Sequence, residues 1–270
     1  AHTLIKIAQV IMLFPFTGWL VKMTYLIVPG EDQKVGYRES YQLKYIGDKV
    51  VFNPATAVVE VVKELERMAS LAEENLNRAM NALITLDEED IEEVYEVEKN
   101  INFLNHAITD YLVKINQTTL PIEDLNSLGA LFHVVNDIER IGDQASDIAE
   151  IVTYLSGACG HNTHIDQMAQ ATIKMVTDSL DAFVRRDLTL AWSVIEYDDV
   201  VDRLFDECKS DLIAEIAQNP EDGERVLDVL MIAKYLERIG DHATNIAEWV
   251  EFSITGSHKS AMHGAEAAAR

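Results

Sequence analysis

Apolar residues recur at the three- and four-residue spacing of amphipathic α-helices from residue 54 to about residue 254. The pattern is interrupted where helices usually begin or end. Asp87 is a candidate N-cap, Pro121 and Gly157 follow apolar stretches, and Asn219-Pro220 closes another. The chain contains only 5 Pro and 12 Gly, which argues against long loops. The pattern predicts six helices, over residues 54–85, 88–117, 122–156, 162–186, 188–218 and 221–254.

Two halves of this helical region are near copies of each other. Residues 138–143 read Ile-Glu-Arg-Ile-Gly-Asp, and residues 236–241 read Leu-Glu-Arg-Ile-Gly-Asp. The match continues along the rest of each helix, which makes a chance resemblance improbable. The repeat predicts an all-α fold of tandem three-helix-bundle repeats that pack side by side, over residues 54–156 and 161–255.

The third helix of each repeat carries an apolar face and an acidic face. The apolar face of the first repeat contains Val134, Ile138, Ile141, Ala145, Ile148 and Val152. Its acidic face contains Glu139, Asp143, Asp147 and Glu150. The acidic face of the second repeat contains Glu237, Asp241 and Glu248, with Asn245 in the place of Asp147. Carboxylates four residues apart on one helix repel each other, so these faces are mildly destabilising unless a cation binds to them. A solvated acidic surface without a ligand is the alternative interpretation.

A second acidic pair lies on the preceding helix of the second repeat, where Asp198 and Asp202 have the same four-residue spacing. Where two such helices run antiparallel, their carboxylates can converge on a hard divalent or ferric ion. This all-oxygen ligand set favours iron, manganese or magnesium over structural zinc. The corresponding positions of the first repeat are Glu98 and Asn102, so one carboxylate is missing there.

Several residues beside these carboxylates have two interpretations each. Glycine inside a helix costs about 1 kcal/mol relative to alanine, so Gly142 and Gly240 indicate either a close helix crossing or room for a ligand. Arg140 and Arg238 can pair with neighbouring carboxylates or contact an anion such as phosphate. His242 is predicted to face solvent, although its imidazole could lie near the second acidic face.

The net charge of −24 excludes some classes of function. Nucleic acids and anionic lipid surfaces need a basic protein surface, which this chain lacks. Cys159 and Cys208 are too few for a disulfide framework and are predicted to be reduced thiols in a cytosolic setting. Residues 159–164 include metal-capable side chains but lack a second cluster. Because the sequence contains no nucleophile elbow, P-loop or dinucleotide-binding turn, it is not predicted to be an enzyme.

The beginning of the chain has a different character. Residues 4–28 are mostly apolar and carry only two charged side chains, and about 20 such residues are enough to cross a bilayer. Residues 1–28 are therefore predicted to be one hydrophobic transmembrane segment that precedes the repeats. A buried helix of a soluble domain is the alternative. Residues 29–53 are predicted to be a linker, with a short strand near residues 50–52, and residues 256–270 a disordered tail.

The repeated motif resembles that of a known family. Both repeats end in Glu-Arg-Ile-Gly-Asp-x-Ala-x-x-Ile-Ala-Glu, which is similar to the PhoU family of phosphate-uptake regulators. In that family, Glu/Asp-x-x-x-Asp pairs on the second and third helices of each repeat bind multinuclear metal clusters. The resemblance implies metal ligands at Glu98, Glu139, Asp143, Asp198, Asp202, Glu237 and Asp241. The first cluster departs from the family pattern at Asn102.

The beginning of the chain resembles a second family. Ala-His-Thr-Leu at residues 1–4, Leu-Phe-Pro-Phe at residues 13–16 and the following Pro29-Gly30 are similar to the last membrane segment of bacterial sodium/phosphate cotransporters. In that family a linker joins the transporter domain to a PhoU-like domain. The resemblance implies that the earlier transporter helices, which bind sodium and phosphate, lie ahead of this sequence.

The two resemblances together predict the C-terminal portion of a sodium-dependent phosphate symporter. Its location would be the bacterial inner membrane, with residues 4–28 in the bilayer and the PhoU-like domain in the cytoplasm, where it regulates phosphate uptake. Homo-oligomerisation stays open. One alternative is a stand-alone PhoU-type regulator of a phosphate ABC transporter and of phosphate signalling. A second alternative is a structural helical bundle that mediates assembly.

Overall fold

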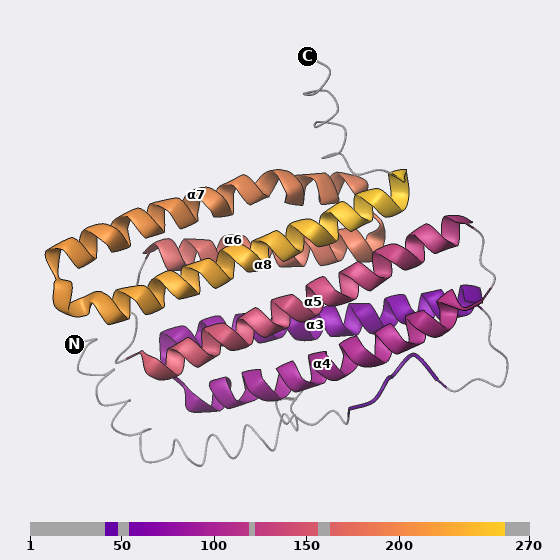
Figure 1. Cartoon of the computed structure of the whole chain (residues 1–270), viewed down its shortest axis with the longest axis horizontal. Helices are drawn as coiled ribbons and strands as arrows, with labels where there is room; N and C mark the ends of the chain where they lie inside the picture. Colours follow the sequence, from indigo (N-terminus) through magenta and orange to yellow (C-terminus); the bar gives the residue numbers. More distant parts are fainter. Residues whose placement is uncertain (1–40, 48–53, 119–121, 156–162, 257–270) are drawn as a thin grey trace, which may run out of the picture. The chain divides into compact units, whose positions relative to one another are not determined.

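The computed structural model describes residues 41–47, 54–118, 122–155 and 163–256. These residues form six α-helices and one short 3-10 turn, and no strand occurs among them (Figure 1). The elements are α3 (Pro54–Thr85), α4 (Glu88–Asn116), α5 (Ile122–Tyr154), α6 (Thr163–Arg185), α7 (Leu188–Gln218), η2 (Pro220–Asp222) and α8 (Gly223–Thr255). The prediction of an all-α fold with six helices is confirmed, and each helix begins and ends within two residues of its predicted limits.

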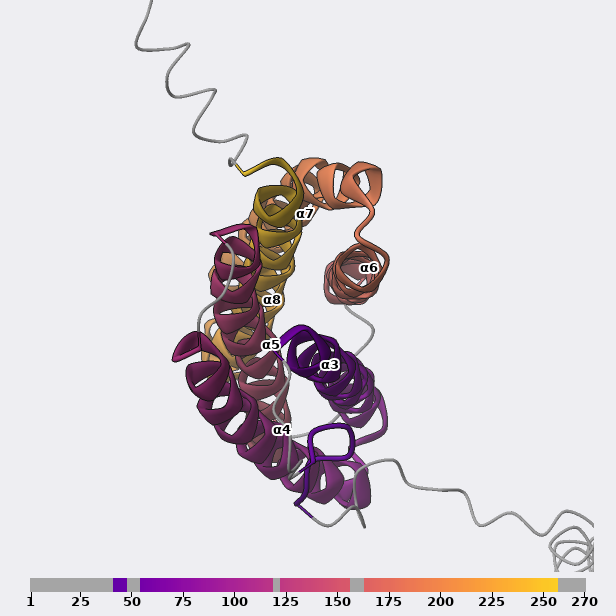
Figure 2. The same ribbon diagram turned by 90° about the vertical axis from the view of Figure 1, so that its right-hand side faces the viewer.

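The six helices are arranged in two layers, which Figure 2 shows nearly end-on. Helices α4, α5, α8 and α7 lie side by side in one layer, and α3 and α6 form the other. Helices α3–α5 make up the first repeat and α6–α8 the second. The repeats meet where α5 packs against α8 and α3 against α6. The second and third helices of each repeat are therefore neighbours, as the metal hypothesis requires.

The turn between the first two helices of each repeat has the same construction. Leu86 (φ 55°) and Arg186 (φ 53°) adopt the left-handed conformation that ends a helix. The next residue, Asp87 or Asp187, is the N-cap of the following helix, and its carboxylate accepts a hydrogen bond from the backbone N–H two residues later. The predicted N-cap at Asp87 is confirmed, and the repeat extends to the turn geometry.

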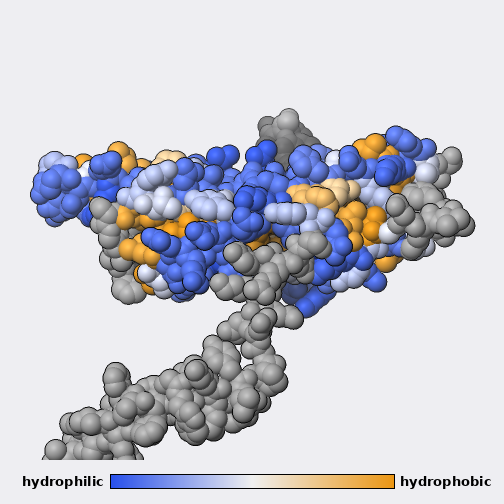
Figure 3. Space-filling model, turned by 90° about the horizontal axis from the view of Figure 1, so that it is seen from below, coloured by the Kyte–Doolittle hydropathy of each residue, from blue (hydrophilic) through white to orange (hydrophobic). Residues whose placement is uncertain are grey.

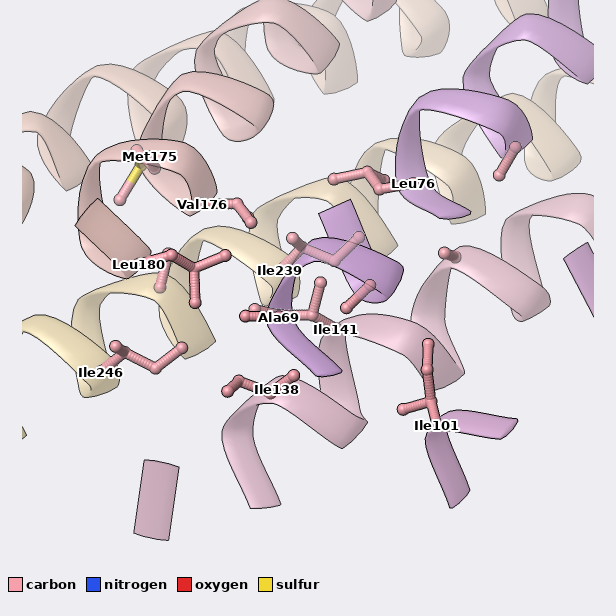
Figure 4. Packing of buried hydrophobic residues seen from close by; sticks show 14 of the residues in the cluster. Ala69, Leu76, Ile101, Ile138, Ile141, Met175, Val176, Leu180, Ile239 and Ile246 are labelled. Atoms are coloured by element: carbon pink, nitrogen blue, oxygen red, sulfur yellow. The ribbon is translucent and has the colours of Figure 1, made fainter. Parts of the chain in front are cut away.

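A continuous apolar core runs through both repeats. The predicted apolar face of α5 is buried: Ile138, Ile141, Ala145 and Ile148 are fully inaccessible to solvent. Figure 4 shows labelled side chains from α3, α5, α6 and α8 that point into this shared interior. Each large aliphatic side chain buried in this way contributes about 1.5–3 kcal/mol, so the two repeats stabilise each other through a common core.

Part of the predicted linker packs against the first repeat. The Glu64 side chain on α3 is fully buried, and its carboxylate accepts hydrogen bonds from the backbone N–H groups of Lys44 and Tyr45, the latter at 2.6 Å. Arg67 holds the same carboxylate at 2.9 Å. Ile46 joins the core. Glu64 therefore fixes Lys44 and Tyr45 to the first repeat.

The surface seen in Figure 3 is mostly hydrophilic, with separate hydrophobic patches. In the part of the chain that the structure describes, no helix combines the length and the apolar character needed to span a bilayer. The predicted membrane segment, the predicted strand near residues 50–52 and nearly all of the predicted tail lie outside the described residues. Cys208 is a free, buried cysteine, and Cys159 also lies outside the described residues.

Candidate functional site

The acidic residues predicted in the second repeat converge between α7 and α8. Burial, followed by the negative charges of Asp202 and Asp241, raises the pKa of Asp198 to about 6. Burial also raises the pKa of Asp241, together with the charges of Glu237 and Asp202, while Lys234 and His242 act in the opposite direction. The four predicted carboxylates therefore form one electrostatically coupled group. This group, Asp198, Asp202, Glu237 and Asp241, is called the second acidic cluster.

One lysine balances part of this charge. Lys234 forms an ion pair with Glu237, one turn away on α8. Arg238, which lies in the motif itself, is exposed, and its charge acts on Asp147 of the first repeat. Among the described residues, Lys234 is the one cation that forms an ion pair with the second acidic cluster, and His242 also lowers the pKa of Asp241.

The first repeat places its acidic residues between α4 and α5 in the same way. Burial raises the pKa of Glu98, and the charges of Asp143 and Glu139 raise it further. The Asn102 amide donates a hydrogen bond to the Glu98 carboxylate. Glu98, Asn102, Glu139 and Asp143 are called the first acidic cluster.

An arginine lies inside this first acidic cluster. Arg140 contacts Glu139 at 3.6 Å and Asp143 at 3.3 Å. Burial raises the pKa of both carboxyl groups, and the arginine charge lowers it. Arg140 therefore pairs with carboxylates, which is one of the two roles predicted for the motif arginines.

The motif glycines mark close approaches between helices. A Cβ on Gly142 would lie 2.9 Å from Cδ1 of Ile101 on α4. A Cβ on Gly240 would lie 3.6 Å from Val201 and 3.7 Å from the Asp198 carboxylate. Ile101 and Val201 occupy corresponding positions in the two repeats. The close helix crossing therefore explains Gly142, whereas a Cβ at Gly240 would meet only ordinary contact distances, one of them to the Asp198 carboxylate.

The prediction that His242 faces solvent is wrong. Its Nδ1 lies 2.9 Å from an Asp137 carboxylate oxygen on α5, and the Asn245 amide donates to the same oxygen at 3.3 Å. The side chain of His242 is only 19% exposed. This contact joins the two repeats, so the register of one repeat alone could not reveal it.

Two further residues next to the first acidic cluster were not predicted. His106 and Asn105 lower the pKa of Glu139 against the larger effect of burial. Both continue the face of α4 that carries Glu98 and Asn102, because they follow at spacings of three or four residues. That spacing was a signal available in the sequence. In the predicted turn at residues 159–164, His164 pairs with Asp211 at 2.8 Å.

The donor set can be tested against the metal that the motif implies. Among the described residues, no group of three or more His, Cys, Asp or Glu side chains is already arranged around a metal position. The chemistry of the second acidic cluster nevertheless fits a hard cation, because four carboxylates supply only oxygen donors. Their mutual repulsion, seen in the raised pKa of Asp198, is what a bound cation would relieve. The first acidic cluster fits less well, since an amide replaces one carboxylate and an arginine occupies two others.

Comparison with known proteins gives a consistent result. A family model described as PhoU domain matches the chain twice, at residues 59–152 and 165–250. A Pseudomonas aeruginosa protein described as a phosphate-specific transport system accessory protein PhoU homolog is 36% identical over 73% of this chain and 84% of its own length. A Clostridium acetobutylicum protein of the same description is 34% identical over 73% of this chain and 92% of its own length.

Solved structures agree with these sequence matches. The crystal structure of PhoU from Pseudomonas aeruginosa has a TM-score of 0.74 and 33% identity, and the match covers 76% of this chain and all of that one. A phosphate transport system regulatory protein PhoU from Streptococcus pneumoniae, with 23% identity and a TM-score of 0.71, shares the fold.

These relatives correct the main functional prediction. They are accessory proteins of a phosphate-specific transport system, and they match the two repeats rather than a sodium/phosphate cotransporter. The prediction of a sodium-dependent phosphate symporter is wrong, and the alternative of a PhoU-type regulator agrees with the matches. The symporter prediction depended on the apolar residues 4–28 and their resemblance to a membrane segment, whereas the PhoU-domain matches cover residues 59–152 and 165–250. The expectation that the chain is not an enzyme is confirmed by the same matches.

Proposed function

The chain belongs to the family of PhoU-domain proteins, and we propose that it is an accessory regulator of a phosphate transport system. The observation that carries the proposal is the match of the PhoU domain to both repeats. Two relatives whose descriptions name a phosphate-specific transport system accessory protein support it, at 34% and 36% identity. In this role the domain works in the cytoplasm and alters the activity of a transporter without transporting phosphate itself.

We further propose that the regulator binds metal at its second acidic cluster. Asp198, Asp202, Glu237 and Asp241 are the residues that would hold the ion, and iron, manganese or magnesium suits their oxygen donors. When bound, the cation supplies positive charge that neutralises these carboxylates and ties α7 to α8. The raised pKa of Asp198 supports this proposal, because burial and the negative charges of Asp202 and Asp241 disfavour its ionised form, and a bound cation would favour that form.

The regulatory role is tested by deleting the gene in the host that carries it and restoring it on a plasmid. We expect the deletion to change phosphate uptake and the activity of a phosphate-starvation reporter. The parent chain should restore both to the level of the undeleted host. If deletion changes neither quantity, the regulatory proposal is refuted.

The same strain separates regulation from metal binding. Asp198→Asn and Asp241→Asn are compared with Glu196→Gln, an exposed position on the same helix as Asp198. The metal content of each purified chain is measured by mass spectrometry after equal exposure to manganese and iron. Metal lost in the two cluster variants and retained in Glu196→Gln supports the metal proposal. Equal metal content in all four chains refutes it and leaves the regulatory role to the uptake assay.

A further inference from the structure

A small cavity lies between the two repeats, away from both acidic clusters. Its volume is about 140 Å³, and its lining comes from α3, α5, α6, α8 and the turn after α6. The residues that matter here are Val58, Val62, Ala130, Phe183, Arg186 and Trp249. Most of this lining is apolar, and none of the described residues around it is acidic. The chain has a net charge of −24, so a cavity lined by a cation and by no carboxylate differs from most of the protein surface.

Arg186 gives this cavity its one charge. It has the left-handed backbone that Leu86 has in the first repeat, 100 positions earlier. Leu86 packs against the apolar core, whereas Arg186 borders the cavity and donates one hydrogen bond to the Ser253 carbonyl at 3.3 Å. In the described part of the chain no carboxylate pairs with Arg186. A guanidinium has five N–H donors, so it retains donors for an anion.

The indole of Trp249 forms a rigid wall of the cavity. Its ring stacks on His133 with centroids 3.9 Å apart and planes 6° from parallel, and it meets Phe252 edge-on at 5.6 Å. These contacts join α8 to α5 and hold the indole in one orientation. The cavity thus combines a fixed aromatic surface with a nearby cation, which is the arrangement of pockets that bind small organic molecules.

We propose that this cavity binds a small organic monoanion with an apolar body, such as an aromatic or short-chain carboxylic acid. The body would lie among Val62, Phe183 and Trp249, and the carboxylate would accept hydrogen bonds from Arg186. The volume is close to that of an apolar cavity of about 150 Å³ that binds benzene. Inorganic phosphate does not suit the cavity, because its apolar walls leave most phosphate oxygens without a donor. This site goes beyond the proposed regulation and does not depend on metal binding.

Binding at this position would act on the junction of the repeats. The lining residues belong to α3 and α5 on one side and to α6 and α8 on the other. A ligand that contacts both sides binds the packed arrangement more tightly than any arrangement in which the repeats separate, so it favours packing. The expected consequence is a higher thermal midpoint in the presence of the acid.

The test uses benzoate as the probe with the full chain, and Trp249 fluorescence and calorimetry as the two readouts. Benzyl alcohol is the neutral control, and inorganic phosphate is the anion control. We expect saturable binding of benzoate in the millimolar range, weaker binding of benzyl alcohol, and no competition by phosphate. Absence of saturable benzoate binding overturns the proposal, including the case in which residues of the chain itself fill the cavity.

Two variants assign the binding to this cavity. Arg186→Leu introduces the residue that the first repeat uses in the same left-handed position, so the backbone is matched. This variant should weaken the binding of benzoate by about tenfold and leave the binding of benzyl alcohol unchanged. Ala130→Leu fills the cavity and should abolish binding of both compounds, while far-ultraviolet circular dichroism checks that both variants remain folded. Benzoate affinity that is unchanged in both variants overturns the proposal.

Discussion

The two acidic clusters occupy corresponding places in the two repeats but balance their negative charge differently. In the first acidic cluster, the Asn102 amide bonds to Glu98, and Arg140 contacts both remaining carboxylates. In the second, Lys234 forms an ion pair with Glu237, and Lys234 and His242 lower the pKa of Asp241 against the larger effects of burial and of Glu237. The Asn102 amide and Arg140 offset part of the charge of the first cluster, whereas the second has a fourth carboxylate and a larger rise in pKa, at Asp198, which an external cation can relieve.

The distance between the helices at the motif glycines also differs between the two repeats. The Cβ position of Gly142 is 2.9 Å from Ile101, but that of Gly240 is at least 3.6 Å from any neighbour. Ile101 places its Cδ1 at 2.9 Å and its Cγ2 at 3.3 Å, whereas the nearest atom of Val201, the corresponding residue of the second repeat, lies at 3.6 Å. The missing Cδ1 and a wider spacing of the helices therefore both contribute, and the helices are more closely packed at the motif glycine of the first repeat than at that of the second.

The largest expected effect is on metal affinity. Asp241→Asn removes a carboxylate from the second acidic cluster and should weaken manganese binding by about 100-fold, which corresponds to ~2.7 kcal/mol. Asp143→Asn, at the corresponding place in the first acidic cluster, should weaken it by less than about threefold, because Arg140 already neutralises that carboxylate. Isothermal titration calorimetry of both variants measures the difference.

Glu196→Gln serves as the control for the metal titrations. It removes one exposed carboxylate from α7 and lowers the total negative charge by the same amount. Its affinity for manganese should match that of the parent chain. If Asp143→Asn weakens binding as much as Asp241→Asn does, the two clusters are equivalent and the contrast is wrong.

Alanine at the two motif glycines should change stability in opposite directions. A Cβ at Gly142 collides with the buried Ile101, and overpacking of this kind costs about 1–3 kcal/mol. Gly240→Ala meets only ordinary contact distances and gains about 1 kcal/mol of helix propensity. Urea unfolding should show Gly142→Ala as less stable than the parent and Gly240→Ala as equally or more stable.

The double variant Gly142→Ala with Ile101→Val identifies the cause. Valine lacks the Cδ1 atom that lies 2.9 Å from the new Cβ, and it is the residue that the second repeat has at this position. Stability should recover relative to Gly142→Ala alone. A double variant as unstable as the sum of the two single changes would show that Ile101 is not the obstacle.

The raised pKa of Asp198 predicts a pH dependence of stability in metal-free protein. Its pKa rises from 3.8 to about 6 on folding, because of burial and the charges of Asp202 and Asp241. A raised carboxyl pKa contributes stability that is fully present below the unfolded value and is lost as the pH rises through the folded value. Near neutral pH, Asp198→Asn should therefore stabilise the chain by about 1 kcal/mol, after allowance for solvent screening.

This gain should disappear on acidification. Below about pH 3 Asp198 is protonated in both states, so the pH-dependent part of the difference in unfolding free energy between variant and parent should vanish. Chelator-treated samples unfolded by urea across this range provide the measurement. Glu196→Gln should show no comparable pH-dependent gain. A gain for Asp198→Asn that stays constant across the range would mean that Asp198 does not titrate as proposed.

The helices were predictable from the sequence because their limits depend on local chemistry. Pro54 begins α3, the Asp87 carboxylate caps α4, and Asn219-Pro220 ends α7. The core face of α5 follows from the spacing of its isoleucines alone. The acidic clusters were also predictable, since a repeat aligned with itself places acids on adjacent helices.

Contacts between distant parts of the chain were not predictable in this way. The pairing of His242 with Asp137 spans 105 positions, and neither residue belongs to a repeated pattern. The capture of residues 44 and 45 by Glu64 depends on an irregular segment. The cavity beside Arg186 exists only because four helices meet there. Each of these depends on how the repeats pack, which periodicity along one helix does not describe.

The smallest predicted effect comes from making the first acidic cluster resemble the second. Asn102→Asp removes the amide that donates to Glu98 and places two carboxylates four residues apart. Metal-free protein should lose about 0.5 kcal/mol, because a part-buried hydrogen bond is replaced by a charge repulsion of a few tenths of a kcal/mol. Manganese should reverse the sign, since the added carboxylate is a further oxygen ligand. Urea unfolding with and without manganese measures both values, and Asn77→Asp, at an exposed position on α3 whose amide donates to the Glu73 carbonyl, is the control. If the variant is destabilised equally with and without manganese, Arg140 rather than Asn102 is the residue that prevents metal binding in the first repeat.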